Sequence, residues 1–241
     1  MAYRNSFIAI GCNGVGQLPR LFFCILFDGF VMAHPYHHSL SSVRSFGGNV
    51  SDFIKIHSWF DETKAHFADF RHRSFRHHKE GVAIMSEVFG PTLMTSCGGV
   101  VPTSKIGEQH ITEDCLSVVS SSDWANSIKF QKWMGTSGNR PYRPERTWGG
   151  ESEDYPFILD FFNRGDRYVH NHSAGCFTLE SLQGEWFTNS AGKAVPLRAA
   201  CEVFLKSRYG AIPSPSDWAK HIRPAAWMVK TQKIEANLPA A

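Results

Sequence analysis

Histidine and aspartate side chains four residues apart are the feature of this 241-residue chain that bears most directly on chemistry. His57 is followed by Asp61, and His110 is followed by Asp114. Residues four apart lie on the same face of a helix, so each pair would place an imidazole beside a carboxylate. Such a pair can bind a divalent metal ion or transfer a proton as a general acid and base.

The helices that must position these pairs belong to a repeated sequence. Residues 120–134 read SSSDWANSIKFQKWM and residues 214–228 read SPSDWAKHIRPAAWM, an offset of 217 − 123 = 94 between the two Asp-Trp pairs. This register extends without a gap back to Arg71 over Gly165, and residues 46–61 match residues 148–163 at an offset of 102. The second copy therefore lacks 102 − 94 = 8 residues, which we assign to a loop or helix end at 62–69.

Comparison of the two copies supports one shared site for the two pairs. In the second copy the four residues His57, Asp61, His110 and Asp114 are replaced by Leu159, Asn163, Phe204 and Arg208. Positions that accept leucine and phenylalanine are expected in the interior, where an unpaired polar group costs about 1–3 kcal/mol. The alternatives are a hydrogen-bonded polar network without a ligand and unrelated surface residues. No HExxH zinc motif is present.

Two further polar positions are kept in both copies. His78 matches His172, and Glu108 matches Glu202. Because they persist where the His/Asp pairs are lost, we expect them to form a shared structural hydrogen bond or helix cap.

A basic run offers a different function. Residues 71–79 read RHRSFRHHK, and Arg71, Arg73, Arg76 and Lys79 could contact the phosphates of a nucleic acid. The run also begins an apolar stripe with spacings of three and four, which predicts one helix over 71–89 with part of the run facing the core. The stripe consists of Phe75, His78, Val82, Met85 and Phe89. A solvent-exposed charged face is therefore the competing interpretation.

The remaining signals predict a mainly α-helical fold, with two tandem copies of a small domain that each contain a short β-hairpin. The hairpins are expected at 95–102 and 188–196, with Gly98 and Gly192 at their turns. A helix should follow each hairpin, and the SxxD motifs at Ser120 and Ser214 resemble capping boxes.

Composition and chain ends set the domain boundaries. We predict an N-terminal extension at 1–31 that is disordered or not native, a first copy at 32–134, a linker at 135–147, a second copy at 148–228 and a tail at 229–241. The apolar segment 20–33 contains Asp28 and is shorter than the ~20 residues of a bilayer span, so no membrane partner is expected. The net charge of +3 does not by itself indicate nucleic acid. None of the six cysteines has a cysteine at the matching position of the other copy, which favours free thiols and a cytoplasmic location.

Several motifs together resemble an uncharacterised domain family of phages and prophage-bearing bacteria. They are SLSSVRSFGG (39–48), IHSWFDETKAHFADFRHRSFRHHKEGV (56–82), VPTSKIGEQHITED (101–114) and SSSDW (120–124). A weaker resemblance covers 148–228, through WGG, VPLR and IPSPSDWAKHI. The resemblance implies a phage or prophage origin and a host cytoplasm, but no activity.

Two functional hypotheses follow from the sequence. In the first, the first copy holds a zinc or manganese ion, or an acid–base site, at His57, Asp61, His110 and Asp114. An enzyme of this kind would catalyse metal-assisted hydrolysis. In the second, the protein is a non-enzymatic module that binds a host or phage protein or, less favoured, a nucleic acid.

Overall fold

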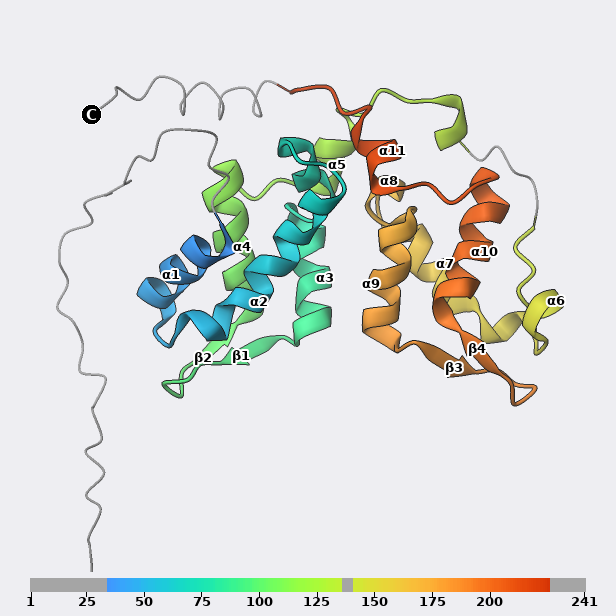
Figure 1. Ribbon diagram of the computed structural model, residues 1–241, viewed down its shortest axis with the longest axis horizontal. Coiled ribbons are helices and arrows are strands. Elements are labelled where there is room, and N and C mark those ends of the chain that lie inside the picture. The colour runs from blue at the N-terminus through green and yellow to red at the C-terminus, as the bar shows by residue number, and fades with distance from the viewer. Residues whose placement is uncertain (1–33, 136–140, 226–241) are drawn as a thin grey trace, which may run out of the picture.

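The computed structural model describes residues 34–135 and 141–225 and is drawn in Figure 1. The predicted extension at 1–31 and tail at 229–241 lie outside these residues, as does part of the predicted linker. Two helical units stand side by side, each with a β-hairpin at the same edge (Figure 1). The predicted mainly α-helical fold with a hairpin in each copy is confirmed.

The first copy begins with a helical pair that packs against a second pair. Its elements are α1 (Pro35–Phe46), α2 (Val50–Asp61), the 3₁₀ helices η1 (Glu62–Ala65) and η2 (Phe70–Phe75), α3 (Lys79–Phe89), β1 (Thr92–Met94), β2 (Val100–Pro102), α4 (Thr103–Cys115), α5 (Ser121–Ala125) and η3 (Lys132–Met134). The eight residues that the second copy lacks fall on η1 and the loop after it. The apolar faces of α2, α3 and α4 meet in a core that includes Phe60, Met85 and Ile106, all 0% exposed.

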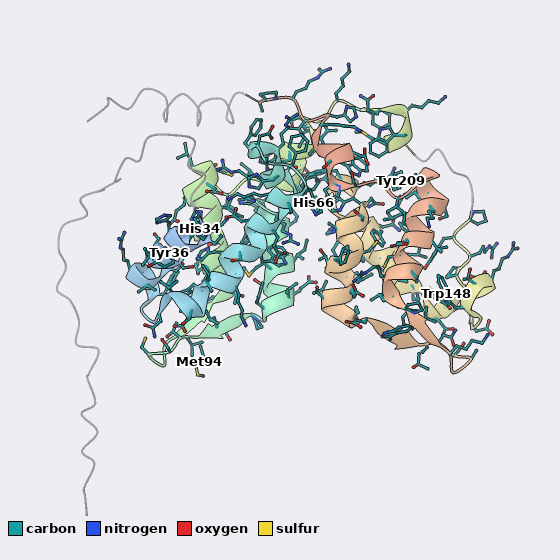
Figure 2. All side chains as sticks on the ribbon, viewed as in Figure 1. His34, Tyr36, His66, Met94, Trp148 and Tyr209 are labelled. Atoms are coloured by element: carbon teal, nitrogen blue, oxygen red, sulfur yellow. The ribbon has the colours of Figure 1, made fainter. Side chains whose placement is uncertain are left out.

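The second copy repeats the order of the later elements but differs in its first half, where α6 has four residues against twelve in α1 and η1 has no counterpart. Its elements are α6 (Glu145–Trp148), η4 (Ser152–Asp154), α7 (Pro156–Asn163), α8 (Arg167–His170), α9 (Ser173–Gln183), β3 (Trp186–Thr188), β4 (Ala194–Pro196), α10 (Leu197–Tyr209) and α11 (Pro215–Ala219). Phe162, which matches Phe60, is likewise fully buried. Side chains fill the space between the helices of each copy (Figure 2).

Both hairpins and both caps form, but the hairpins span 92–102 and 186–196, so each begins two or three residues before the predicted range. β1 pairs antiparallel with β2, and β3 pairs with β4 in the equivalent register. Gly98 and Gly192 have φ angles of 83° and 71° at the turns, a region that glycine adopts without strain. Ser120 and Ser214 each accept a hydrogen bond from the backbone N–H three residues later and so cap α5 and α11.

The predicted single helix over 71–89 is wrong, because the chain breaks between η2 and α3. His78 is extended, with φ −156° and ψ 169°, and its Nδ1 accepts a hydrogen bond from Gly81 N–H at the start of α3. The turn passes so close to the new helix that a Cβ on Gly81 would lie 2.0 Å from the carbonyl oxygen of Arg76. A cap and a close backbone contact therefore replace the expected helical turn.

The two copies meet in a junction that is close to two-fold symmetric. Ile128 forms an isolated antiparallel bridge with its own counterpart, Ile222. Lys129 N–H donates to His221 O, and Arg223 N–H donates to Ser127 O, both at 2.8 Å. The 94-residue offset turns the first of these bonds into the second, as in the self-complementary interface of a symmetric dimer.

Cys97, Cys115, Cys176 and Cys201 are free thiols, and the last three are buried. The helices in the described ranges are too short or too polar to cross a lipid bilayer.

Candidate metal centre

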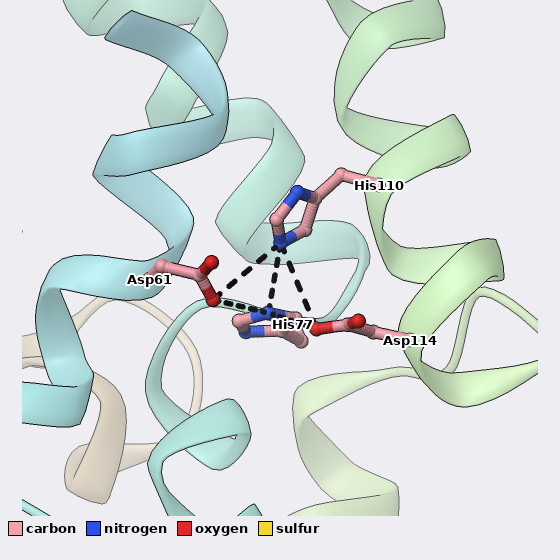
Figure 3. A group of neighbouring side chains, drawn as sticks. All are labelled: Asp61, His77, His110 and Asp114. Carbon is pink, nitrogen blue, oxygen red and sulfur yellow. Dashed lines mark hydrogen bonds and ion pairs between the residues drawn. The ribbon is translucent and has the colours of Figure 1, made fainter. Parts of the chain in front are cut away.

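Four ionisable side chains converge in the interior of the first copy. Asp61 is the last residue of α2, His110 and Asp114 lie one turn apart on α4, and His77 lies in the turn before α3. Their side chains point toward one another (Figure 3), and one ligand atom from each lies within 4.8 Å of all the others. All four residues are at most 6% exposed.

The distances between these atoms run from 3.0 Å to at most 4.8 Å and surround those expected for ligands of one ion. His77 Nε2 lies 3.0 Å from His110 Nε2 and 3.2 Å from Asp114 Oδ2. His110 Nε2 lies 3.8 Å from Asp114 Oδ2, and Asp61 Oδ1 lies 3.9 Å from Nε2 of each imidazole. Ligand atoms about 2.0–2.1 Å from a tetrahedral zinc ion lie roughly 3.3–3.4 Å apart. The spacing therefore suits a first-row divalent ion.

The polar atoms of this cluster are poorly satisfied by the protein itself. Neither oxygen of Asp61 accepts a well-directed hydrogen bond, although Lys64 Nζ forms an ion pair with Oδ1 at 2.7 Å. Asp114 Oδ2 and His77 Nδ1 also lack hydrogen-bond partners. Buried polar atoms are nearly always bonded to protein, water or an ion, so these atoms mark a place where a water molecule or a cation can bind.

Burial keeps the imidazoles of the cluster neutral, and neighbouring nitrogens keep Asp114 ionised. Burial, reinforced by neighbouring histidines, holds the pKa of His110 well below its usual value. Burial likewise lowers the pKa of His77, against the opposing effect of Asp114. Burial alone would raise the pKa of Asp114, but the nearby nitrogens of His38, His77 and Arg73 outweigh it and hold that pKa well below its usual range. Neutral imidazole and carboxylate are the forms that bind metals.

A chain of hydrogen bonds determines which nitrogen of His110 carries the proton. Gln109 donates from Nε2 to Glu113 at 2.8 Å, which turns its carbonyl oxygen toward Ser42 Oγ at 3.0 Å. Ser42 gives its single proton to that oxygen and must accept at its 2.9 Å contact with His57 Nε2. His57 therefore carries its proton on Nε2.

The same reasoning extends from His57 into the cluster. Burial lowers the pKa of His57 to about 3, so its ring is neutral and Nδ1 is an acceptor. The 3.0 Å contact between His57 Nδ1 and His110 Nδ1 then requires His110 to donate from Nδ1. A neutral His110 has its lone pair on Nε2, which accepts a hydrogen bond from His77 Nε2 at 3.0 Å and also faces Asp61 and Asp114. A metal ion at this place would replace that hydrogen bond, and the proton of His77 would move to its Nδ1, which has no hydrogen-bond partner. Hydrogen bonding at the far nitrogen is the usual way in which proteins orient a metal-binding histidine.

A buried imidazolium borders the centre on the side of α1. His38 Nδ1 lies 2.6 Å from Glu113 Oε2, and its Nε2 lies 3.4 Å from Asp114 Oδ1. Burial lowers the pKa of His38, but the two carboxylates outweigh burial and raise it to about 9. Arg73 adds a second cation, with Nε 3.4 Å from Asp114 Oδ2 and a hydrogen bond from Nη1 to Asp114 O. These contacts hold the α4 carboxylate in place.

Three of the four predicted ligands lie together, and one does not. Asp61, His110 and Asp114 share the cluster, whereas His57 lies behind His110 and contacts it through Nδ1. His77 completes the set and was not among the predicted ligands. It lies in a turn, where helical spacing gives no signal. The repeat does carry one, because the matching residue in the second copy is Asn171.

The shared polar residues lie apart from this centre. His78 and His172 are the N-caps of α3 and α9, each accepting from the N–H of a glycine at the third helical position. Glu108 is not bonded to His78. It lies on the outer side of α4 in an ion pair with Lys105, and Glu202 holds the matching place on α10.

The basic run is largely engaged within the protein. Arg71 pairs with Asp69, Arg73 contacts Asp114, and Arg76 stacks on the Trp59 ring while bonding to Glu62. Lys79 is the exposed member of the run. These contacts oppose a phosphate-binding role for the three arginines.

The second copy fills the equivalent space without ionisable ligands. Asp61, His77, His110 and Asp114 correspond to Asn163, Asn171, Phe204 and Arg208. Arg208 Nη1 donates to Asn163 Oδ1 at 2.9 Å and lies 3.5 Å from Asn171 Oδ1. Phe204 stacks on Phe162 at 17°, much as His110 stacks on Phe60 at 19°. The packing is preserved while the ligands are gone.

Comparison with known proteins identifies the repeated unit. The family model described as Domain of unknown function (DUF6915) matches residues 33–134 and again residues 142–228. A search of curated proteins and a search of solved structures find no match. Because the two matches cover well over half of the chain, the protein belongs to the DUF6915 family, whose domain it contains twice.

Proposed function

We propose that the first copy binds a divalent metal ion through Asp61, His77, His110 and Asp114. The observation that carries this proposal is the convergence of four buried ligand atoms within 4.8 Å of one another, from three separate segments of the chain. Two imidazoles and two carboxylates form a nitrogen and oxygen set that suits zinc, manganese or iron.

The second copy supports a cation at this place. There the two carboxylates are gone, and the guanidinium of Arg208 bonds to the asparagine that replaces Asp61. A permanent positive charge thus accompanies the loss of the ligands. The fold has a polar position at the ends of α2 and α4 that is stabilised by positive charge, supplied by arginine in one copy and by a metal ion in the other.

The chemistry of the centre follows from its ligands. A bound divalent ion would lower the pKa of a water ligand and polarise a carbonyl or phosphoryl oxygen, so an enzyme built on it would catalyse metal-assisted hydrolysis. His38 and Glu113 lie beside Asp114 as a candidate acid–base pair for such a reaction. The sequence resemblance adds a phage or prophage setting, and the unmatched cysteines favour the cytoplasm. A role as an interaction module remains the alternative prediction.

Metal content tests the proposal directly. The full chain would be purified without a metal-binding tag and analysed by plasma mass spectrometry beside a variant that carries the second copy's residues. That variant is Asp61→Asn, His77→Asn, His110→Phe and Asp114→Arg. We expect near-stoichiometric zinc, manganese or iron in the natural protein and none in the variant.

We expect the variant to fold, because the second copy has the same four residues at the matching positions of the same fold. Circular dichroism and thermal unfolding would check this. If the natural protein, incubated with zinc, manganese and iron and then desalted, retains no metal, the proposal is wrong. Equal metal content in a folded variant would contradict it as well.

A further inference from the structure

His72 is a fully buried histidine that the four-residue centre leaves out. It lies in η2 and is 0% exposed. Its Nδ1 donates to the backbone oxygen of Asp69 at 2.6 Å, and its own carbonyl accepts from Thr63 Oγ1 at 3.1 Å. The residue is therefore held on both sides by the backbone of its own loop.

The bond to Asp69 determines the tautomer of His72. A carbonyl oxygen only accepts, so His72 must carry a proton on Nδ1. With that proton on Nδ1, the other nitrogen of the neutral ring, Nε2, holds a lone pair. That Nε2 atom has no hydrogen-bond partner.

The free nitrogen lies beside Asp61, at the edge of the metal centre. His72 is not one of the four residues whose ligand atoms all lie within 4.8 Å of one another, so it would reach a shared ion only through a shift of its own side chain or that of Asp61. His72 Nε2 lies 3.9 Å from Asp61 Oδ1, and the His72 ring meets the His77 ring edge-on at 5.4 Å between centroids. Asp61 Oδ1 is thus 3.9 Å from three imidazole nitrogens, those of His72, His77 and His110. A lone pair and a carboxylate oxygen repel each other at this distance unless a cation or a donor lies between them.

The second copy changes this position together with the others. His72 corresponds to Asp166, whose carboxylate turns away to accept hydrogen bonds from Ser121 at 2.6 Å and Ser122 at 3.0 Å. The second copy, which lacks the four ligands, therefore lacks this imidazole too. Its aspartate instead forms hydrogen bonds to the first copy across the junction.

We propose that His72 is a fifth ligand of the metal centre, which makes the site one of three imidazoles and two carboxylates. This inference rests on the proposed function. Five protein ligands exceed the four of a closed tetrahedral zinc site and leave one position of an octahedron for water or substrate. The site should therefore prefer an ion that accepts five or six ligands, such as manganese(II) or iron(II), over tetrahedral zinc.

The experiment counts imidazole ligands in the full chain. X-ray absorption spectra of the manganese-loaded and zinc-loaded protein would be compared with those of His72→Asn. Asparagine keeps a donor near the position of Nδ1, so the bond to Asp69 can persist while the Nε2 lone pair is removed. His170→Asn is the matched control, because it removes a buried imidazole from the second copy.

We expect three imidazoles in the natural protein and in the His170 variant, and two in His72→Asn. Loss of a residue that only orients a ligand typically lowers metal affinity roughly 10- to 100-fold. Loss of a ligand itself should lower the manganese affinity of His72→Asn by at least this much. Two imidazoles in all three proteins, with equal manganese affinity, would overturn the fifth ligand and leave the four-ligand centre standing. Metal binding by none of them would overturn the proposed function itself.

Discussion

The hydrogen-bond chain behind His110 predicts that Ser42, which touches no ligand atom of the centre, controls metal affinity. Ser42 is fully buried on α1 and accepts from His57 Nε2. In Ser42→Ala that acceptor is lost, so His57 is free to move its proton to Nδ1. His110 would then have to accept at Nδ1 and carry its own proton on Nε2, the atom required for the metal.

The expected loss of metal affinity follows from the role of these hydrogen bonds in orienting His110. Loss of the partner that orients a metal-binding histidine typically costs 10- to 100-fold in affinity, or about 1.4–2.8 kcal/mol. The metal-free protein should lose only the net value of the hydrogen bonds removed, about 1–2 kcal/mol in its free energy of unfolding. The assay is a calorimetric titration of the metal-free full chain with manganese or zinc against a competing chelator, beside urea unfolding in EDTA.

Ser39→Ala is the matched control, because Ser39 is equally buried on the same helix but donates to the Pro35 carbonyl. It should lower stability by about 1 kcal/mol and leave metal affinity unchanged. Metal affinity in Ser42→Ala equal to that of the natural protein would refute the reasoning about tautomers. Equal losses in both variants would show that disturbance of α1, and not the chain through His57, is responsible.

Three further predictions concern stability and the turn that carries His77. In metal-free protein, the raised pKa of His38 stabilises the fold fully below about pH 6.5, and this contribution is lost as pH rises toward 9. The difference in unfolding free energy between the natural protein and His38→Gln should therefore shrink by about 3 kcal/mol across that window, as measured by urea titration in EDTA. Gly81→Ala and Gly175→Ala should each cost more than about 2 kcal/mol, because the new Cβ would meet a backbone oxygen at 2.0 or 1.9 Å, and thermal unfolding would measure the loss. Only Gly81→Ala should also weaken metal binding, since the turn it displaces holds His77, and equal metal titrations for the two variants would contradict this.

The repeat made the fold largely predictable from sequence. A hairpin, a following helix and a capping box appear twice with the same spacing, and each local signal agrees with the others. The break before α3 was missed because Phe75 and Val82 keep helical spacing across it. The turn capped by His78 happens to keep these two side chains on one side, so periodicity alone does not show the break. The residue that indicates it is Gly81, where a Cβ would lie 2.0 Å from the Arg76 carbonyl oxygen.

The site was less predictable, for a geometric reason. Spacing along one helix finds pairs such as His110 and Asp114, but it gives no information on residues that a turn brings in from elsewhere. His57 shares a helix with Asp61, yet its Nε2 is bonded to Ser42 on α1 and its ring lies behind His110. The signal that could have found His77 is its replacement by Asn171 in a copy that also lost the other ligands.

The second copy has a physical role even without ligands. α8 and α11 pack against η2. Ser216 Oγ donates a hydrogen bond to the carbonyl oxygen of His66, which lies in the loop before η2. Tyr168 donates to Ser121 O at 2.9 Å across the same junction. η2 carries His72 and leads directly into the turn with His77, so the second copy buttresses the irregular segment of the centre. Helices α2 and α4 are held by the core of the first copy, whereas this segment has few helical bonds of its own. If the first copy binds a metal ion as proposed, these contacts of the second copy would help to hold His72 and His77 in place.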